Sequence, residues 1–157
     1  MTDVEYARAF FEKDYFATEA AGIVIEEAAP GHALVSCVTE RRHKNASDRV
    51  MGAVYTTMAD FAFAVAANYG NPVTVSLNLQ VSFLSSARGG KLFARAEKIR
   101  EGRQTAFYEV FVTDELGTDI ARVQATGHKM KPLLPPYTPE EGEYNPYREQ
   151  MASLRQP

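Results

Sequence analysis

Residues 51–70, MGAVYTTMADFAFAVAANYG, read as a helix that is apolar on nearly every side. Such a helix needs cover on every side, either from the rest of the chain or from lipid. Several features argue against a membrane span: the flanks are not basic, no second hydrophobic segment exists, and the segment holds four polar residues, Thr56, Thr57, Asp60 and Asn68. The chain must therefore supply the cover itself.

A change of period marks the end of this helix. The helix is expected to begin near Met51 and to stop at YGNP, where Gly70 and Pro72 provide a C-cap and a break. In the strand 74–83, apolar residues alternate with a second set, Thr74, Ser76, Asn78, Gln80 and Ser82. This second face is polar but uncharged, which indicates an interface or a ligand wall. Three further antiparallel strands are predicted in KLFARAEKI, TAFYEVFVT and TDIARVQATGHKM.

The segments before the long helix are shorter. Residues 3–13 have the spacing of an amphipathic helix with Asp3 as N-cap. GIVIEEA and HALVSCVT, separated by the turn APG, predict a hairpin over residues 22–39. The polar stretch ERRHKNASDR predicts a loop, and three of its residues are candidate caps for the long helix: Asn45, Ser47 and Asp48.

This element order predicts an α+β protein in which a curled antiparallel sheet wraps one long central helix, the layout of the hotdog fold. We expect a single hotdog domain over residues 1–131, including the N-terminal helix. A tail, 132–157, contains most of the prolines and cannot continue the sheet.

Composition narrows the partners. The net charge of −3 gives no basic patch for nucleic acid, and no segment suits a membrane. The start lacks the basic and apolar regions of a secretion signal, and the single cysteine, Cys37, excludes an internal disulfide. A cytoplasmic protein is expected. The three histidines, His32, His43 and His128, lack metal-ligand spacing, so no metal site is expected.

Asp60 is the residue that most needs an explanation. A lone buried carboxylate costs many kcal/mol, so it must be paired, hydrated, neutralised or exposed to a cleft. One alternative is structural: a hydrogen bond to Thr56 or Thr57 solves a packing problem. The other is functional, because carboxylates in apolar settings gather at active sites.

The sequence resembles the phenylacetate-pathway type of acyl-CoA thioesterase in the hotdog superfamily over roughly residues 20–130. The resemblance is carried by Asn45, Gly52, MAD ending at Asp60, AAN ending at Asn68, FLSSARGGKL, GRQTAFYEV and ARVQATG. It implies that Asp60 acts as nucleophile or general base, that the Gly52 N–H polarises the thioester carbonyl, and that Asn45 assists. It also implies that Asp60 comes from one chain and Asn45 with Gly52 from another, so that the active unit is a homodimer, often paired into a homotetramer. Coenzyme A is then part of the substrate, and no cofactor is implied.

Two positions depart from the family, which usually has HGG where this chain has MGA. Met51 replaces a histidine and Ala53 replaces a glycine, both at the substrate-binding helix entrance. Methionine cannot carry charge or donate a hydrogen bond. Three polar strand residues are candidates to position water or substrate, Thr74, Ser76 and Asn78, and Asn78 is the preferred one.

Contacts to the phosphates and to the acyl group of the substrate are predicted from the residue types in the turns and in the core. SARGGK offers Arg88, Gly89 and Lys91 for the phosphates of coenzyme A, and REGR offers Arg100 and Arg103. The alternative is that both are ordinary solvated turns. The acyl group is expected near aromatic residues that suit a protein core equally well: Tyr55, Phe61, Phe63 and Phe83.

Four functions are compared on these residues. Thioester hydrolysis is favoured by Asn45, Gly52 and Asp60. A hotdog hydratase or dehydratase is disfavoured, since such enzymes pair the acid with a histidine and only His43 lies nearby. A non-catalytic acyl-CoA binding or sensing protein is favoured by Met51 alone. A serine hydrolase is disfavoured because no G-x-S-x-G motif occurs.

Overall fold

The computed structural model describes residues 2–69 and 73–130. Its elements follow in the order α1 (Asp3–Phe11), the π-helical turn η1 (Phe16–Ala20), β1 (Ile23–Ala29), β2 (His32–Val38), the 3₁₀ turn η2 (Arg41–His43), α2 (Gly52–Asn68), β3 (Thr74–Phe83), β4 (Lys91–Glu101), β5 (Thr105–Asp114) and β6 (Asp119–Lys129). The predicted stop at Gly70 and Pro72 and the predicted tail 132–157 lie outside the described residues.

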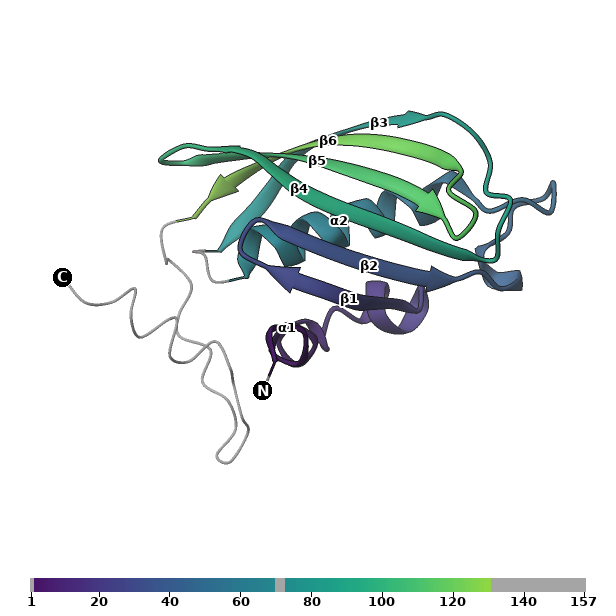
Figure 1. Ribbon diagram of the computed structural model, residues 1–157, viewed down its shortest axis with the longest axis horizontal. Coiled ribbons are helices and arrows are strands. Elements are labelled where there is room, and N and C mark those ends of the chain that lie inside the picture. The colour runs from purple at the N-terminus through teal and green to yellow at the C-terminus, as the bar shows by residue number, and fades with distance from the viewer. Residues whose placement is uncertain (1, 70–72, 131–157) are drawn as a thin grey trace.

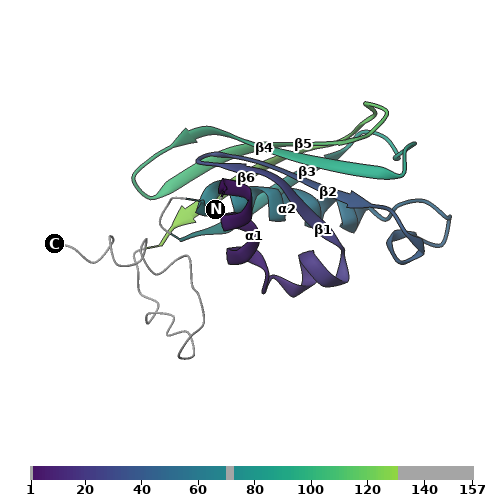
Figure 2. The same cartoon turned by 60° about the horizontal axis from the view of Figure 1, so that its bottom comes forward.

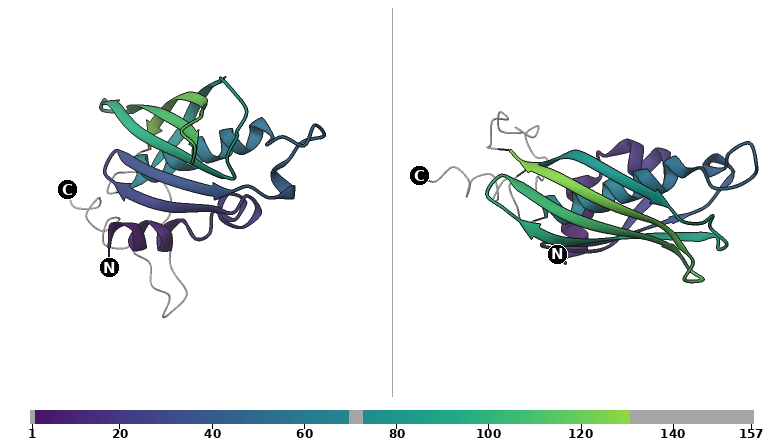
Figure 3. Two further views of the ribbon diagram at one scale, coloured as in Figure 1. Left: turned by 45° about the vertical axis from the view of Figure 1, so that its right-hand side comes forward. Right: turned by 90° about the horizontal axis from the view of Figure 1, so that it is seen from above.

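The six strands form one antiparallel sheet in the order β1-β2-β4-β5-β6-β3. Figure 1 shows this sheet arching over α2, and the view from above in Figure 3 shows the strands lying across the helix. This is the hotdog fold, so the predicted fold class is confirmed. Two strands are edges of the sheet, β1 at one side and β3 at the other.

The core fills the space between the concave face of the sheet and α2. Alternate residues of the central strands are buried there, and so is most of the helix, including Met58, Phe63 and Val65. The helix needs apolar side chains on most of its faces because the curled sheet covers it from several directions. None of the helices in the described residues is long and apolar enough to cross a membrane.

The N-terminal segment differs in detail from the prediction. Thr2, rather than Asp3, caps α1, because the Thr2 hydroxyl accepts from the Glu5 N–H while the Glu5 carboxylate accepts from the Thr2 N–H. The helix ends at Phe11, and η1 follows it, which the sequence did not predict. In Figure 2, α2 lies between the sheet and the pair formed by α1 and η1, and η1 contacts α2.

The β1–β2 hairpin agrees with the prediction, whereas the loop before α2 differs from it. The β1–β2 hairpin turns at Gly31, whose φ of 81° suits glycine. The predicted caps Asn45, Ser47 and Asp48 do not cap α2: the N-cap is Met51, and no side chain caps it. The loop is instead closed on itself by a bridge between Lys44 and Val50.

Candidate active site

One stripe of α2 is left partly open by the sheet. Its members are small or polar, namely Gly52, Ala53, Thr56, Thr57, Asp60 and Ala64, and all are half-buried or exposed, whereas most of the rest of the helix is buried. The predicted burial of Asp60 is therefore only partial within one chain. This stripe carries the two helix residues that the sequence assigned to chemistry, Gly52 and Asp60.

Asp60 is held by β3. The Ser76 hydroxyl donates to Asp60 Oδ1 at 2.8 Å. The two threonines considered as structural partners for Asp60 donate elsewhere, Thr56 to the Gly52 carbonyl at 3.2 Å and Thr57 to the Ala53 carbonyl at 2.8 Å. Neither threonine is therefore the partner of Asp60, because both hydroxyls bond back to the helix backbone, and the neighbour that bonds Asp60 is Ser76.

A β-bulge in β3 decides which polar residues face Asp60. Ser76 lies opposite Gly127 of β6, whereas Asn78 lies opposite the preceding β6 residue, Thr126, because Leu77 is the extra residue between them. Consecutive residues of β6 point to opposite faces of the sheet. Gly127 points toward α2, because a Cβ added to it would lie 2.7 Å from Phe63 Cζ. Ser76 therefore faces α2 and Asn78 faces away. The preference for Asn78 is corrected to Ser76.

The same bulge corrects the predicted polar face of β3. Thr74 lies on the α2 side and is buried, with its N–H donating to Asn68 Oδ1 at 2.8 Å. Beyond the bulge the α2 side is taken by Leu79, Val81 and Phe83, whose β6 partners are buried. A single inserted residue exchanges the two faces of the strand. The uncharged polar face predicted for residues 74–82 is thus divided between both sides of the sheet.

Asn45 is oriented by its own loop. Its Oδ1 accepts the N–H groups of Ser47 at 2.9 Å and Arg49 at 3.2 Å, in an Asx-type turn. Because the oxygen is used in this way, the amide NH₂ is the part of Asn45 directed to other partners. The loop is exposed, so this donor is accessible to a ligand.

The entrance of α2 is formed by Met51, Gly52 and Phe83. Met51 is 53% exposed. The Phe83 ring lies so close to Gly52 that an added Cβ would be 3.2 Å from it. Glycine at this position therefore keeps the helix N-terminus and the ring in contact, and it leaves the backbone N–H as the group that Gly52 offers.

Gly52 and Asp60 are far apart within one chain. They are eight residues apart in sequence, and a rise of 1.5 Å per residue separates them by about 12 Å along α2. No thioester carbonyl can contact both residues of the same helix at that distance. A site that uses both needs two copies of the chain.

The segment 84–90 uses its backbone differently from the prediction. The N–H groups of Arg88 and Gly89 donate to Asp114 Oδ2 at 2.8 and 2.9 Å, and that of Gly90 donates to Glu115 Oε1 at 2.7 Å. Burial raises the pKa of Asp114, but these and further backbone hydrogen bonds more than offset it and hold the pKa well below its ordinary value. The N–H groups of Arg88, Gly89 and Gly90 are therefore taken by the protein's own carboxylates.

The basic residues expected to bind phosphate are not brought together. Lys91 Nζ pairs with Glu26 Oε1 at 3.2 Å. Arg88 precedes β4 and Arg103 follows it, so the length of that strand, about 33 Å, separates them. Figure 1 shows the β4–β5 turn at the end opposite to the start of α2. One basic residue was missed: Arg49 Nη1 donates to Ser86 Oγ at 3.4 Å and so lies beside the segment that contains Arg88.

Three of the four aromatic residues considered for the acyl site belong to the core. Tyr55, Phe61 and Phe63 are each at most 4% exposed, and the Tyr55 hydroxyl accepts the Ala87 N–H at 3.2 Å. Phe83 is 58% exposed. Among the four, only Phe83 is therefore available to a ligand in the single chain.

A second carboxylate near Asp60 was also missed. Asp14 lies in the turn between α1 and η1, and the charge of Asp60 acts on it. Partial burial, and after it this charge, raises the pKa of the Asp14 carboxyl. No sequence pattern connects residues 14 and 60, because their proximity arises only when η1 packs on α2.

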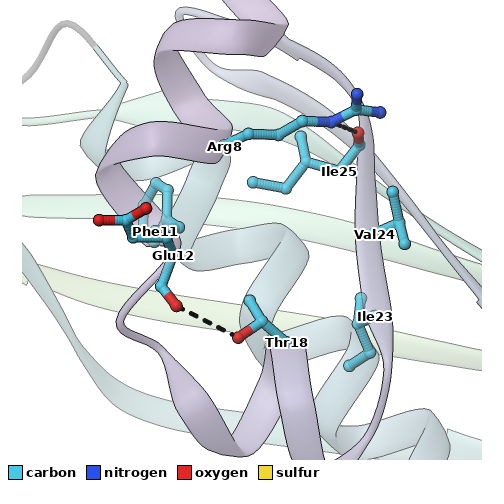
Figure 4. A pocket seen from close by; sticks show the side chains of 7 residues that line it. All are labelled: Arg8, Phe11, Glu12, Thr18, Ile23, Val24 and Ile25. Carbon is cyan, nitrogen blue, oxygen red and sulfur yellow. Dashed lines mark hydrogen bonds between the residues drawn. The ribbon is translucent and has the colours of Figure 1, made fainter.

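A cavity of about 250 Å³ lies elsewhere, between α1, η1 and β1 (Figure 4). Its lining is Arg8, Phe11, Glu12, Thr18, Ile23, Val24 and Ile25. Arg8 Nε donates to the Ile25 carbonyl at 2.8 Å, and the Thr18 hydroxyl donates to the Glu12 carbonyl at 3.4 Å. None of the residues expected to carry chemistry lines it.

The single cysteine contacts a histidine, with Cys37 Sγ 3.7 Å from His43 Nε2, and both side chains are buried away from the stripe of α2 that carries Asp60. The buried His43 accepts the Glu40 N–H at Nδ1, so Nε2 carries the proton and donates to the Ala21 carbonyl at 2.8 Å. Its ring therefore holds the loop to the start of β1. Cys37 is buried in the core, as expected. Within residues 2–69 and 73–130, no group of three or more histidine, cysteine or acidic residues could hold a metal ion.

Comparison with known proteins agrees with this fold. The thioesterase superfamily model matches residues 48–121, which include α2 and most of the sheet. A mutant structure of the phenylacetic acid degradation protein PaaI from Thermus thermophilus is 30% identical, with a TM-score of 0.68 over 72% of this chain and 97% of that one.

Two curated relatives agree with the match. The acyl-coenzyme A thioesterase PaaI of Escherichia coli is 27% identical over 79% of this chain and 89% of the relative. A putative esterase of Archaeoglobus fulgidus is 29% identical over 71% of this chain and 73% of the relative. The chain belongs to the thioesterase superfamily of thioester hydrolases, and within it to the PaaI-like family.

Proposed function

We propose that this protein hydrolyses acyl-CoA thioesters to the free acid and coenzyme A, with Asp60 as the reacting carboxylate. The observation that carries the proposal is the position of Asp60 on the partly open stripe of α2, hydrogen-bonded by Ser76 at 2.8 Å. A carboxylate fixed in this way is accessible to substrate and oriented before substrate arrives.

Asp60 acts in one of two ways in this proposal. As a general base it takes a proton from water, whose oxygen attacks the thioester carbon; as a nucleophile its own oxygen attacks, and water then cleaves the anhydride. Both routes expel the thiolate of coenzyme A. Because Ser76 occupies Asp60 Oδ1, the oxygen that reacts is Oδ2, and Ser76 is a positioning residue.

The carbonyl oxygen needs hydrogen-bond donors as negative charge develops on it. The Gly52 N–H at the uncapped N-terminus of α2 and the amide NH₂ of Asn45 are the donors we assign to it. A helix N-terminus carries partial positive charge, which favours an oxyanion. Both donors come from one chain and Asp60 from another, because Gly52 and Asp60 of one helix are about 12 Å apart.

A homodimer is therefore part of the proposal. The outer edge of β3 lies at the border of the sheet in the described chain, and apolar side chains are exposed along it, Val75 by 39% and Leu77 by 61%. An unpaired apolar strand edge next to a stripe of small residues favours association with a second copy. Further assembly into a homotetramer stays a prediction.

Coenzyme A phosphates are assigned to the basic side chains near the entrance of α2. Arg49 lies beside the segment of Arg88, and the Arg88 guanidinium is exposed. Arginine suits phosphate because its donors form a planar fork. Lys91 is not assigned this role, since its Nζ pairs with Glu26 Oε1 at 3.2 Å.

Met51 supports the alternative of an acyl-CoA binding protein without turnover. Its exposed side chain stands at the helix entrance, where it contributes surface but no hydrogen bond or charge. Hydrolysis is favoured over this alternative because Asp60 has its positioning partner and Asn45 its oriented amide.

The test measures release of free thiol from aryl, short-chain and long-chain acyl-CoAs by the wild type and by Asp60→Asn. Loss of the base or nucleophile is expected to lower kcat by about 10²–10⁴-fold, with an unchanged fold by circular dichroism. Thioester binding without turnover in the wild type supports the binding protein instead. Equal turnover by the variant refutes the role of Asp60.

A further inference from the structure

The side chain of Asn68, at the C-terminal end of α2, links this helix to β3. Asn68 is buried, with 8% exposure. Its Oδ1 accepts the Thr74 N–H at 2.8 Å, and its NH₂ donates to the Thr74 carbonyl at 3.2 Å and to the Ala64 carbonyl at 2.9 Å. The carboxamide therefore bonds both backbone groups of the first residue of β3 and one carbonyl of its own helix. In Figure 1, β3 begins beside this end of α2 and runs back over the helix.

A second hydrogen bond between α2 and β3 lies two residues farther along the strand. It is the bond from the Ser76 hydroxyl to Asp60 Oδ1 at 2.8 Å. Thr74 and Ser76 share the face toward α2, because alternate residues of a strand point the same way. Asn68 and Asp60 are about two helical turns apart, with Ala64 one turn from each. The strand is thus joined to the helix at its first residue and again at the residue that bonds Asp60.

Pairing within the sheet leaves the spacing between β3 and α2 open. β3 is an edge strand, paired in the described chain with β6 alone, and ladder hydrogen bonds lie in the plane of the sheet. The β6 partner of Ser76 is Gly127, which has no side chain to pack between sheet and helix. The bulge at Leu77 then interrupts the pairing directly after Ser76. The distance from Ser76 to α2 therefore depends on the contact that precedes it in the strand, at Thr74.

We propose that Asn68 is a positioning residue, which sets the distance between the Ser76 hydroxyl and the Asp60 carboxylate by fixing the start of β3 on α2. The inference rests on the proposed function, in which Asp60 reacts and Ser76 orients it. Its physical basis is the short range of a hydrogen bond: a shift of about 1 Å at Ser76 takes the two oxygens out of bonding distance. Because the carboxamide is also bonded to the Ala64 carbonyl, it carries the position of the helix to the strand.

The experiment measures kcat and KM for acyl-CoA hydrolysis by two variants of Asn68. A serine in a helix can bond the carbonyl four residues earlier, so Asn68→Ser keeps the bond to Ala64 but is too short to reach Thr74. Asn68→Ala removes all three bonds. Both variants are expected to lower kcat about fivefold, less than the roughly tenfold loss of a whole charge-assisted hydrogen bond. KM should change little, because the donors assigned to the thioester, Gly52 and Asn45, are untouched, and an unchanged kcat refutes the inference.

Two comparisons separate positioning from loss of stability. Tyr108→Phe is the matched control, since the Tyr108 hydroxyl donates to the Ala66 carbonyl at 3.4 Å and so ties the same end of α2 to β5 instead of β3. It is expected to leave kcat unchanged. In the Ser76→Ala background, the Asn68 variants should lower kcat by less than about 1.5-fold, because the bond that they loosen is already absent. Losses that multiply would overturn the inference, and so would an equal loss in Tyr108→Phe.

A second measurement does not depend on turnover. A crystal structure of Asn68→Ser is expected to place Ser76 Oγ more than about 3.5 Å from Asp60 Oδ1, beyond hydrogen-bonding distance. A distance that stays near 2.8 Å would refute the positioning role. If the wild type hydrolyses no acyl-CoA, the proposed function fails, and this distance alone decides whether Asn68 positions Ser76. If hydrolysis occurs but the losses of the two residues multiply, only the role of Asn68 fails.

Discussion

Mixing two inactive variants tests whether the site is shared between chains. A carbonyl oxygen lies about 3 Å from its donor N–H, and its carbon about 3.5 Å from the attacking oxygen, so donor and carboxylate stand at most about 7–8 Å apart when the carboxylate attacks, and about 10 Å apart when it activates a water. Gly52 and Asp60 of one helix are about 12 Å apart along its axis. The Asp60 side chain leans toward the helix N-terminus and recovers roughly 2–3 Å, but the Gly52 N–H points along the axis away from Asp60, so an oxygen bound to it lies farther still from the carboxylate.

The perturbation combines Asp60→Asn with Asn45→Ala, each expected to be nearly inactive alone. In a shared site, a mixed dimer has one site with both defects and one site with none. Random pairing at equal concentrations gives mixed dimers in half of the molecules, so about a quarter of wild-type activity should return.

The assay is thiol release from an acyl-CoA after the two variants are unfolded together and refolded. Each variant refolded alone serves as the control, with circular dichroism to show that the fold is retained. A mixture that remains as inactive as its parents would refute the two-chain site, because each chain would then contain its whole site.

Three further outcomes are expected. Ser76→Ala should lower kcat about tenfold with little change in KM, because a charge-assisted hydrogen bond to Asp60 contributes roughly 1.5–3 kcal/mol; steady-state kinetics on the variant checks this, and an unchanged kcat contradicts it. Gly127→Ala should destabilise the fold by about 1–3 kcal/mol, since the added Cβ would lie 2.7 Å from Phe63; urea denaturation measures it, and a stability equal to wild type would show that α2 can move. Asp114→Asn should cost about 2–3 kcal/mol near neutral pH through weakened backbone hydrogen bonds. The pKa of Asp114 is lowered by folding, so its contribution is present above the ordinary value of 3.8 and is lost as the pH falls below it; thermal melts at neutral and acid pH should show the two proteins converging in acid.

Much of the fold could be predicted from local patterns. The apolar stretch 51–70 and the alternation of the strands after it were sufficient for the layout, because hydrophobic periodicity reflects what each element buries. The start of α2 near Met51 followed from the same pattern. The N-cap of α1 was missed because Thr2 and Asp3 are both good caps, and only the reciprocal contact with Glu5 distinguishes them.

The bulge at Leu77 could not be predicted, and it determines which of the polar β3 residues faces Asp60. Leu77 continues the alternation in sequence, so the pattern gave no sign that the two faces exchange there. The bulge is visible only in the pairing with β6, where Ser76 lies opposite Gly127 and Asn78 opposite Thr126. Counted along one strand, Ser76 and Asn78 share a face and the spacing does not decide between them, whereas the pairing with β6 places them on opposite faces.

The segment SARGGK shows a second limit of prediction from the sequence. SARGGK has the composition of a phosphate loop, yet its N–H groups are occupied by Asp114 and Glu115 from the β5–β6 turn. Those acids are more than twenty residues away in sequence, and only the sheet brings them close. Composition identifies the donors of a loop but not the acceptors that the rest of the fold supplies.

The position of Asp60 explains the unusual composition of α2. A surface helix normally places charged residues along the side that its sheet does not cover. Here that side has small residues, including Gly52, Ala53 and Ala64, with Asp60 as its one charge. Small residues allow another backbone to approach closely, and a carboxylate set among them would be excluded from bulk water once that approach occurs. The helix is therefore apolar on nearly every side for two reasons: the sheet covers most of it, and in the dimer that we propose a second copy covers the remainder and completes the site around Asp60.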